Sequence, residues 1–536
     1  MLILSPESNT NTLFWRFLHE EHQNSMIYVL ELLVLGFVGW RIWRFTLSPM
    51  IYPNDPKELP YWIPFIGHGL EFFHDSQALL AKASNYFANS KDPFALTVFG
   101  SKLYVISDSK QTNEVYKNLE TLSFIEFVQG LFKINGVSEA GIKAAYTDLP
   151  VDKPGFPNPQ GKSLGGTLVR QMHIHQLYPG ENLDHLEARF LEYFEKNLTL
   201  PMLRTACAPY LLSQDDTSVD VPLMRWCSEY FVRAGGLAYF GDMLGAIDPE
   251  LAPTFIAFDD LSWQAIYQYP RSWSKVMSAK RDQTQRAFRK YFEVPQNLRT
   301  GDAWFTKTME NELRAVGVGT NDIATILVTL HWAINTNTRK VAFWMLTYLL
   351  HNTSYIGPLR KETAAAFDGD KPVDLEHLHN NCPLLESFWF ETLRMSSNAA
   401  SVRLVNKDTI IGNRVLRNGN RIMIPYRLLH FDETVHGPDV YSFKPERFAG
   451  ANAEKLTRGD IWRPFGGGKT MCSGRHIAKR ATLMFLSIVL RKFDIEILGE
   501  RNMPAPDLGR PVLGIMAVKD DQDYTVRVSE RNRVSE

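Results

Sequence analysis

Cysteine is scarce in this chain of 536 residues, which holds only Cys207, Cys227, Cys382 and Cys472. They are scattered and form no CxxC pair, so the sequence indicates neither a disulfide framework nor a zinc site. This usage fits a reducing compartment. A formal net charge of −1 gives no reason to expect a nucleic-acid partner. Since no repeat and no linker rich in Pro, Gly or Ser divides the chain, one large domain is favoured.

A glycine-rich loop near the C-terminus delivers a single cysteine, in residues 464–475, PFGGGKTMCSGR. Three glycines allow positive φ and let a flat, bulky group approach the backbone. Cys472 comes just before an apolar helical pattern, where free amides and the helix dipole favour a thiolate. Such a thiolate is a good axial ligand for haem iron.

Two other interpretations of this loop compete with a haem ligand. Gly468-Lys469-Thr470 imitates the end of a phosphate-binding loop, but that motif needs a glycine where Arg463 stands, and no apolar strand comes before it. The loop could also be a structural turn that buries its cysteine. The other motifs of the chain decide against this second alternative.

The pattern Phe465-x-x-Gly468-x-x-x-Cys472-x-Gly474 resembles the haem-binding signature of the cytochrome P-450 superfamily. The resemblance implies haem b with Cys472 as the iron ligand. It also implies that Phe465 packs near the thiolate and that the glycines clear room for the haem. The expected fold is mainly α with small β-sheets.

The N-terminal region predicts a membrane anchor. We expect a polar segment over 1–25, an anchor helix over 26–47, a proline-rich hinge over 48–68 and the haem-binding catalytic domain over 69–536. The apolar run Met26–Trp40 is shorter than the ~20 residues of a spanning helix, so a buried helix is the alternative. Arg41 and Arg44 predict a cytosolic catalytic domain on a single-pass anchor, and the resemblance places it in the endoplasmic reticulum membrane.

A long helix is predicted from Asn321 to Leu350, with Thr320 or Asn321 as its cap. Small and polar residues interrupt its apolar pattern at Ala333–Thr338, which is similar to the family's oxygen-binding turn. The resemblance assigns Thr336 and Asn337 to oxygen activation, with Ala333 beside them. Ile334, Thr336 and Asn337 stand where the family usually has a glycine, an acid and a threonine.

Two further motifs complete the resemblance. Glu391-x-x-Arg394 places opposite charges on one helix face, and Arg447 follows in Pro-Glu-Arg-Phe. These resemble the structural Glu-Arg-Arg cluster of the family. Arg403 matches the arginine that binds a haem propionate, while the usual Trp-x-x-x-Arg is missing. The substitutes that the sequence offers are Arg170, His173 and His175.

Two aromatic groups and a hairpin are also predicted. One group, in the loop over the haem, comprises Phe124, Phe127, Leu131 and Phe132, and ordinary core packing is its alternative. The other could roof the substrate pocket, although core packing is the better interpretation; it comprises Phe255, Phe258, Trp263 and Tyr267. Residues 94–107 predict a β-hairpin around Gly100-Ser101.

The resemblance implies a haem-thiolate monooxygenase that inserts oxygen from O2 into an apolar small molecule. Electrons would come from a separate NADPH-cytochrome P-450 reductase, with cytochrome b5 as a second donor, because no flavin or nicotinamide domain is seen. Asn337, Thr470 and His430-x-Asp432 resemble the branch of bile-acid hydroxylases and prostacyclin synthase. A fungal terpenoid or alkaloid pathway is the expected setting. The alternatives are a haem-thiolate isomerase or dehydratase acting on a peroxide, and a non-catalytic haem-binding membrane protein.

Overall fold

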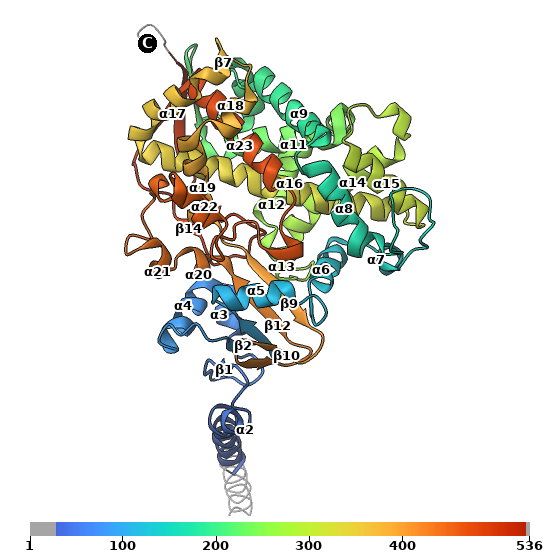
Figure 1. The fold of residues 1–536 in the computed structure, drawn as a ribbon, viewed down its shortest axis with the longest axis vertical. Helices are drawn as coiled ribbons and strands as arrows, with labels where there is room; N and C mark the ends of the chain where they lie inside the picture. Colours follow the sequence, from blue (N-terminus) through green and yellow to red (C-terminus); the bar gives the residue numbers. More distant parts are fainter. Residues whose placement is uncertain (1–27, 532–536) are drawn as a thin grey trace, which may run out of the picture.

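A computed structural model describes residues 28–531, and the predicted polar segment 1–25 lies outside them. The described chain is mainly helical with small sheets, as expected from the resemblance. Figure 1 shows a sheet-containing lobe beside a larger helical lobe, with the N-terminal helix below. The longer helices are α4 (Ser76–Tyr86), α5 (Ser109–Lys117), α6 (Ile125–Asn135), α7 (Glu139–Tyr146), α8 (Val169–Leu177), α9 (Glu181–Asn197), α11 (Leu223–Ile247), α12 (Leu251–Asp260), α14 (Lys275–Glu293), α15 (Trp304–Ala315), α16 (Thr320–His351), α17 (Ile356–Thr363), α19 (Pro383–Ser396) and α23 (Arg475–Lys492).

The largest sheet has six strands in the order β1-β2-β3-β12-β9-β4. The predicted hairpin is confirmed, since β2 and β3 pair antiparallel with Val98 opposite Ser101. Strand β9 lies between β12 and the edge strand β4 and alternates in burial, so every second side chain points into the core. The strands are β1 (Lys57–Glu58), β2 (Phe94–Val98), β3 (Ser101–Val105), β4 (Leu122–Ser123), β9 (Ala400–Val405) and β12 (Arg421–Pro425).

A four-stranded sheet, in the order β13-β16-β6-β5, joins the C-terminus to the start of α11. Small two-stranded ribbons complete the β-structure of the described residues. The strands are β5 (Ser213–Gln214), β6 (Ser218–Pro222), β13 (Phe493–Ile497) and β16 (Thr525–Glu530), with ribbons β7 (Phe367–Asp368)/β8 (Lys371–Pro372), β10 (Thr409–Ile411)/β11 (Arg414–Leu416) and β14 (Pro506–Asp507)/β15 (Ala517–Val518).

Helix α16 runs through the middle of the helical lobe and packs against α11, α14, α19 and α23. The predicted long helix is therefore confirmed, but its predicted cap is wrong. The helix begins at Thr320 after Gly319, and no side chain caps it. Its second half is buried on all sides, so α16 is the axis of the core.

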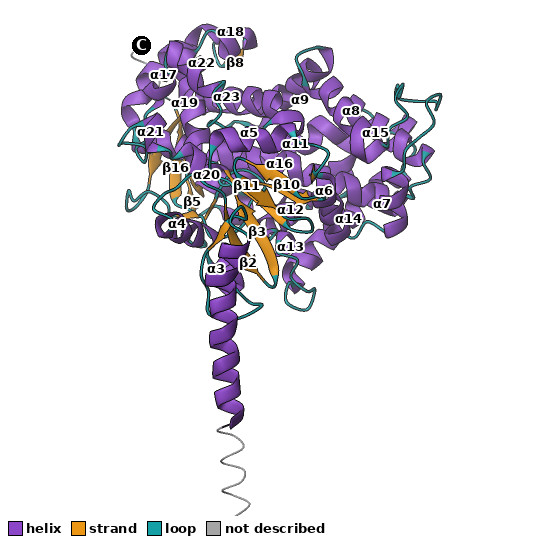
Figure 2. Ribbon diagram, turned by 60° about the horizontal axis from the view of Figure 1, so that its bottom comes forward, coloured by secondary structure: helices purple, strands orange, loops and turns teal. Residues whose placement is uncertain are grey.

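The N-terminal helix projects from the sheet-containing lobe (Figure 2). Helical structure continues to Ile51, beyond the predicted end of the anchor helix, through a π-helical turn at Trp43–Leu47 that leads into α2 (Ser48–Ile51). Arg41 donates to the Tyr61 carbonyl at 2.6 Å, and Arg44 pairs with Glu58 at 2.9 Å. The two arginines thus dock the helix end on the hinge.

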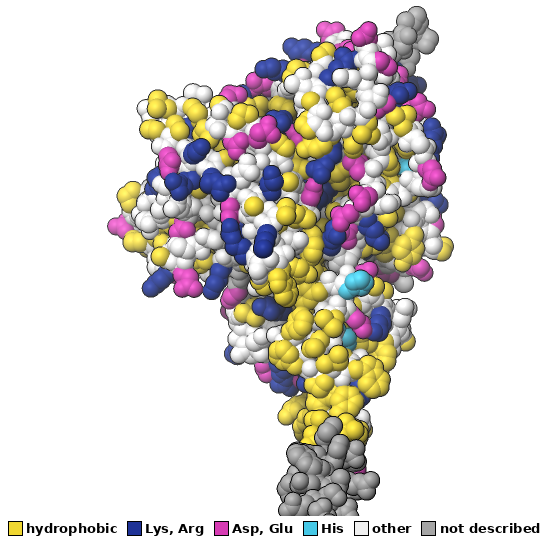
Figure 3. All heavy atoms as spheres, turned by 180° about the vertical axis from the view of Figure 1, so that it is seen from behind, with side chains coloured by type: hydrophobic (Ala, Val, Ile, Leu, Met, Phe, Trp, Pro, Cys, Tyr) yellow, Lys and Arg dark blue, Asp and Glu magenta, His cyan; other side chains and the backbone are white. Residues whose placement is uncertain are grey.

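The proline-rich segment is part of the folded domain, since β1 pairs with β2 and Leu59 is buried. Figure 3 shows an apolar surface running from the N-terminal helix onto the neighbouring lobe. Its exposed side chains include Trp62, Ile63, Phe65 and Leu70. Within residues 28–531 no helix has both the length and the apolar character needed to span a membrane.

Candidate functional site

The cysteine loop lies between a 3-10 turn at Gly468–Thr470 and α23. The Cys472 N–H donates to the Phe465 carbonyl at 2.9 Å, which ties the two signature residues together. The Phe465 ring stacks on Trp389, with 5.9 Å between centroids. Residue Cys472 is exposed, whereas Cys207, Cys227 and Cys382 are buried.

The Cys472 thiol opens onto accessible space although protein atoms surround the loop. This enclosure raises its pKa, while the Gly474 and Arg475 amides and the Arg475 charge act in the opposite direction. An enclosed thiol that keeps an open side can bind a metal without moving its backbone. The donors at the start of α23 favour the thiolate that such binding requires.

The glycines of the loop accommodate tyrosines. A Cβ at Gly467 would lie 2.8 Å from the Tyr116 ring, and one at Gly468 would lie 2.9 Å from the Tyr116 Cβ. Gly468 also has a φ of +59° and therefore favours glycine. Tyr116 reaches Tyr426 through a 2.8 Å bond between their hydroxyls. Packing of Tyr116 is therefore a reason for glycine at 467 and 468, and the expectation that the glycines also clear room for the haem stays a prediction.

The predicted Glu-Arg-Arg residues lie together behind this loop. Glu391 and Arg394 form a fully buried bidentate pair, with bonds of 2.7 and 2.8 Å. Arg447 approaches Glu391 at 3.4 Å and also binds the Asp439 carboxylate at 2.6 Å. The Lys444 amide donates a third bond to Glu391 at 3.0 Å. One carboxylate therefore joins α19 to the segment that leads into the cysteine loop.

Arg403, on β9, is a buried cation with no carboxylate partner among residues 28–531. Its guanidinium donates to Ser401 Oγ at 2.8 Å and Thr470 Oγ1 at 2.7 Å. It also lies 4.6 Å from the centroid of Phe124, at the start of the predicted aromatic loop. Burial lowers the pKa of Arg403. A buried cation needs an anion, and a propionate beside the cysteine loop would supply one.

The three substitutes for the missing propionate motif lie in different surroundings. Arg170 donates to the Lys469 carbonyl at 2.5 Å and is beside the cysteine loop. His173 packs on Phe305, where burial lowers its pKa to about 4. His175 is exposed and packs on a tryptophan ring of α15. Only Arg170 of these three contacts the loop.

One face of α16 is open in the middle of the helix. Ala333 is exposed, and Leu330, Ile334 and Asn337 are partly accessible. Their spacing of three and four residues puts them on one stripe of the helix. We refer to this stripe as the open face. An apolar and narrow stripe within a buried helix fits the wall of an internal cavity.

Asn337 connects the open face to the turn at 513–516. Its carbonyl accepts from the Ile515 N–H at 3.0 Å. A Cβ at Gly514 would lie 2.5 Å from the same oxygen, so glycine is needed for this approach. The bond fixes the amide orientation and leaves the Asn337 NH2 as the donor that remains.

Thr336 points away from the open face into a buried polar cluster. Its hydroxyl accepts from Lys340 Nζ at 3.0 Å and bonds the Asp259 carboxylate of α12. Asp259 also binds Arg339 Nε at 2.9 Å and Trp332 Nε1 at 2.8 Å. Positive charge from Lys340 and Arg339 outweighs burial and holds the pKa of Asp259 well below its usual range.

Of the four residues predicted to roof the substrate pocket, two are buried in the core and two are partly exposed. Phe255 and Phe258 are fully buried in the cluster beneath α12 and are core residues. Trp263 and Tyr267 are partly exposed. The partly buried apolar side chains that pack against this cluster come from α6, from the residues after α12 and from the turn at 513–516; they are Leu131, Ile134, Leu261, Ile266 and Leu513.

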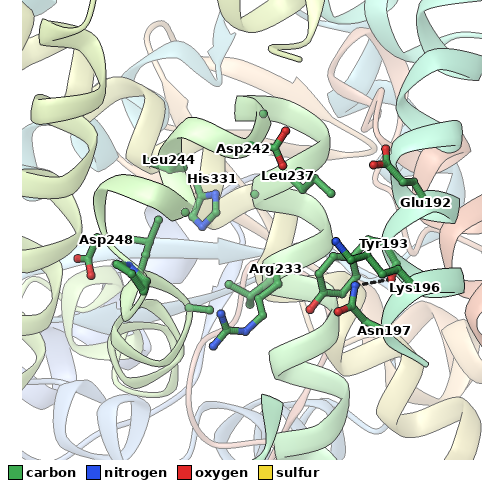
Figure 4. A pocket seen from close by; sticks show the side chains of 17 residues that line it. Glu192, Tyr193, Lys196, Asn197, Arg233, Leu237, Asp242, Leu244, Asp248 and His331 are labelled. Carbon is green, nitrogen blue, oxygen red and sulfur yellow. Dashed lines mark hydrogen bonds between the residues drawn. The ribbon is translucent and has the colours of Figure 1, made fainter. Parts of the chain in front are cut away.

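A separate pocket of about 360 Å³ lies between α9, α11, the start of α12 and α16 (Figure 4). His331 of α16 lines this pocket, and burial lowers the His331 pKa to about 3. None of the predicted site residues lines this pocket. It is consequently distinct from the space at Cys472 and the open face.

Several residues beside the candidate site were not predicted from the sequence. Tyr116 and Tyr426 support the glycine loop from positions 310 residues apart. Asp259 and Lys340 meet Thr336 from two helices. The one available signal was the charge of Arg339 and Lys340 inside an apolar helix, which requires a buried partner.

These features fit a haem: an enclosed but open thiol, a buried arginine without an acid, and an open helix face. The class they define is a haem-thiolate protein. Residues 258–522 match the family model for cytochrome P450. The chain belongs to the cytochrome P450 family. Because its relatives are named as monooxygenases or hydroxylases, we identify it as a monooxygenase of that family.

The chain is similar to a cytochrome P450 monooxygenase, poxD, of Penicillium oxalicum, at 26% identity over 84% of this chain and 90% of the relative. It is 24% identical to the monooxygenase nodJ of Hypoxylon pulicicidum, over 85% and 86% of the two chains. A third relative is the 5-beta-cholestane-3-alpha,7-alpha-diol 12-alpha-hydroxylase of Sus scrofa, 25% identical over 95% and 99%. Family membership implies haem with a cysteine ligand and electrons from a reductase.

Proposed function

We propose that this protein uses O2 and electrons from an NADPH-dependent reductase to insert oxygen into an apolar small molecule of secondary metabolism, a terpenoid or alkaloid. The observation that carries the proposal is the open Cys472 thiol beside an arginine that lacks an acid partner. Two monooxygenases and a 5-beta-cholestane-3-alpha,7-alpha-diol 12-alpha-hydroxylase among the relatives support oxygen insertion as the reaction.

Each part of the site has a proposed role. Haem, when bound, supplies the chemistry of oxygen activation and C–H oxidation. Cys472 would hold its iron, while Arg403 and Arg170 would hold its propionates. Glu391 and its two arginines would keep the cysteine loop in place.

The walls of the cavity support an apolar substrate. Ala333, Ile334 and Leu330 present accessible apolar surface on α16, and Leu131 and Leu513 pack against the buried cluster that contains Trp332 of the same helix. Asn337 would place the 513–516 turn against the substrate, because its carbonyl is committed to Ile515. Its remaining amide N–H can orient a water or a substrate oxygen.

The test is turnover of the full chain with its reductase, NADPH and a panel of terpenoids and alkaloids. The proposal expects NADPH and O2 to be consumed and 18O from O2 to appear in the product. Conversion of an organic peroxide with no NADPH consumed would contradict it and favour the isomerase. The altered turn at Thr336 and Asn337 is what makes this comparison informative.

The proposal also includes an N-terminal anchor in the endoplasmic reticulum membrane, with the domain cytosolic and cytochrome b5 as a second donor. Exposed apolar side chains from Tyr28 to Ile51 and around Trp62 support it. Removing residues 1–40 keeps Arg41 and Arg44 on the hinge and should lower membrane association without loss of haem. Unchanged membrane binding of a variant that also carries Trp62→Ser and Phe65→Ser would contradict it.

A further inference from the structure

The pocket drawn in Figure 4 lies behind α16, on the side of that helix opposite the open face. His331 of α16 lines it, and at about 100° per residue this position is about 160° around the helix from Ala333. The pocket volume of about 360 Å³ lies in the range of small-molecule sites, ~300–1,000 Å³. A ligand in this pocket would therefore occupy a place separate from that of the substrate.

Two helices each present one face to the pocket. The side chains that they contribute are three and four positions apart, which puts each set on one helix face. They are Tyr193 and Lys196 of α9, and Arg233 and Leu237 of α11. Helix α11 breaks at Gly241, where φ is +64° and a Cβ would lie 2.1 Å from the Thr300 carbonyl oxygen. Residues on both sides of this break line the pocket, so the break helps to shape it.

Apolar side chains form the inner wall of the pocket. Val232, Leu244 and Leu251 line it and are buried. The His331 ring is enclosed by aromatic rings, and its centroid lies 4.7 Å from that of Phe255. Burial lowers the His331 pKa to about 3, so the ring is neutral at physiological pH. The inner wall that these residues form is uncharged and favours the hydrocarbon part of a ligand.

The three acids that line the pocket are engaged by other groups. Arg189 binds Glu192 at 2.5 Å and approaches Asp242 at 3.5 Å. Asp248 accepts a hydrogen bond from the Glu250 N–H at 3.0 Å. Glu192 and Asp242 are also exposed, so water and salt screen their charge. These carboxylates tolerate a singly charged anion in the pocket, but they disfavour a second negative charge.

The hydrogen-bond donors of the pocket are free, in contrast to its acids. Arg233 binds the buried Glu229 through Nε at 3.0 Å, and no bond to another residue of the described chain engages its two terminal NH2 groups. Within residues 28–531 the Lys196 ammonium and the Tyr193 hydroxyl also have no hydrogen-bond partner. Figure 4 shows the Arg233 and Tyr193 side chains reaching toward the middle of the pocket from the two helices.

We infer that this pocket binds the carboxylate of a small apolar acid. The terminal NH2 groups of Arg233 suit the two oxygens of a carboxylate, and Tyr193 and Lys196 supply further donors. The hydrocarbon part of the acid lies against Val232 and Leu244. A phosphate fits less well, because the acids that line the pocket repel its second negative charge.

The inference is tested by fluorine NMR on the haem-loaded full chain. The probe is octanoate with a terminal trifluoromethyl group, and the control ligand is the alcohol with the same chain. We expect the acid to bind at least about 10-fold more tightly than the alcohol, because its hydrogen bonds are charge-assisted. Equal affinity of the two ligands would overturn the inference. Tighter binding of octyl phosphate would overturn the assignment to a carboxylate.

Two variants that fill different cavities locate the bound acid. Gly245 lines the pocket, and a Cβ there would have no atom within 4 Å, so Gly245→Leu occupies the pocket without a clash. We expect this variant to lose binding, and Ala333→Leu on the open face to keep it. Binding that survives Gly245→Leu would overturn the inference. Binding that is lost in Ala333→Leu would also overturn it, because the acid would then lie beside the open face.

Two further variants test the donors without leaving a buried charge unpaired. Tyr193→Phe should weaken binding of the acid about 10-fold. Lys196→Met should weaken it by about 2–5-fold, less so at high salt, because this lysine is exposed. The matched control is Lys290→Met, which removes an exposed lysine of α14 outside the pocket and should change nothing. Unchanged affinity in both Tyr193→Phe and Lys196→Met would overturn the inference.

Discussion

The cysteine-loop side and the α16 side of the site hold buried charge in different ways. Behind the cysteine loop, Glu391 and Arg394 are three residues apart on one helix. On the other side, Asp259 and Arg339 are 80 residues apart on two helices. The first arrangement fixes the loop that carries the cysteine to one helix, whereas the second joins α12 to α16. Buried charge therefore holds a loop on one side and two helices together on the other.

The largest expected effect tests the local pair. Glu391→Ala leaves Arg394 buried without its acid, and losing one partner of a buried pair costs about 3–5 kcal/mol. We expect little haem-loaded protein and a lower free energy of unfolding in denaturant titration.

The matched control is Glu293→Ala, which removes an exposed helix pair with Arg289 and should cost about 0.3–0.5 kcal/mol. Equal free energies of unfolding for the two variants would show that the buried Glu391 pair contributes no more stability than the exposed pair.

Arg403 gives a test in which two measurements move in opposite directions. Arg403→Met removes a buried cation without an acid, so the haem-free protein should become more stable. Haem affinity should fall by about 1.5–3 kcal/mol, or about 10–100-fold, measured as haem transfer to an excess of apomyoglobin. Loss of stability in the haem-free form would show that Arg403 is satisfied without a propionate.

Asn337→Leu sharpens the description of the α16 side. The Ile515 N–H loses its acceptor, at a cost of about 1–3 kcal/mol, and the 513–516 turn should exchange its amide hydrogens faster by mass spectrometry. Asn337→Asp keeps an acceptor and serves as the control. Faster exchange should accompany weaker substrate binding, and unchanged exchange in the Leu variant would rule out the link to Ile515.

The smallest effect concerns Asp523, whose pKa burial raises to about 6. Because the folded protein holds this proton more tightly than the unfolded chain, Asp523 destabilises the fold increasingly as pH rises through about 4–6. Relative to Asp523→Asn, the unfolding free energy of the unmodified protein should fall by about 2–3 kcal/mol between pH 4 and 7. Parallel stability curves would contradict this shift.

Local patterns made much of the fold and of the cysteine side predictable. The hairpin at Phe94 and the long helix with its polar turn were visible as periodicity, and the Glu391 pair as spacing. The helix at the start of the described chain was expected to end at Leu47, and it runs on to Ile51 through a π-helical turn at Trp43–Leu47. Such errors concern where an element ends, not whether it exists.

The α16 side was not predictable in the same way. Thr336 was expected at the oxygen site, and its contact with Asp259 depends on how α12 crosses α16. The acceptor role of Asn337 depends on a turn 178 residues later. Side-chain partners at such separation leave no periodicity or spacing in the sequence. Glycine is likewise needed at positions 467 and 468 because Tyr116, far earlier in the chain, packs against both.

The central claim is that Cys472 presents a thiolate to haem iron. The most direct test is the ferrous–carbon monoxide difference spectrum of the full chain and of four variants, each with one cysteine replaced by serine. We predict one haem b per chain, with the strongly red-shifted Soret band of thiolate ligation in every protein except Cys472→Ser. Retention of that band in Cys472→Ser, or its loss in Cys207→Ser, Cys227→Ser or Cys382→Ser, would contradict the account.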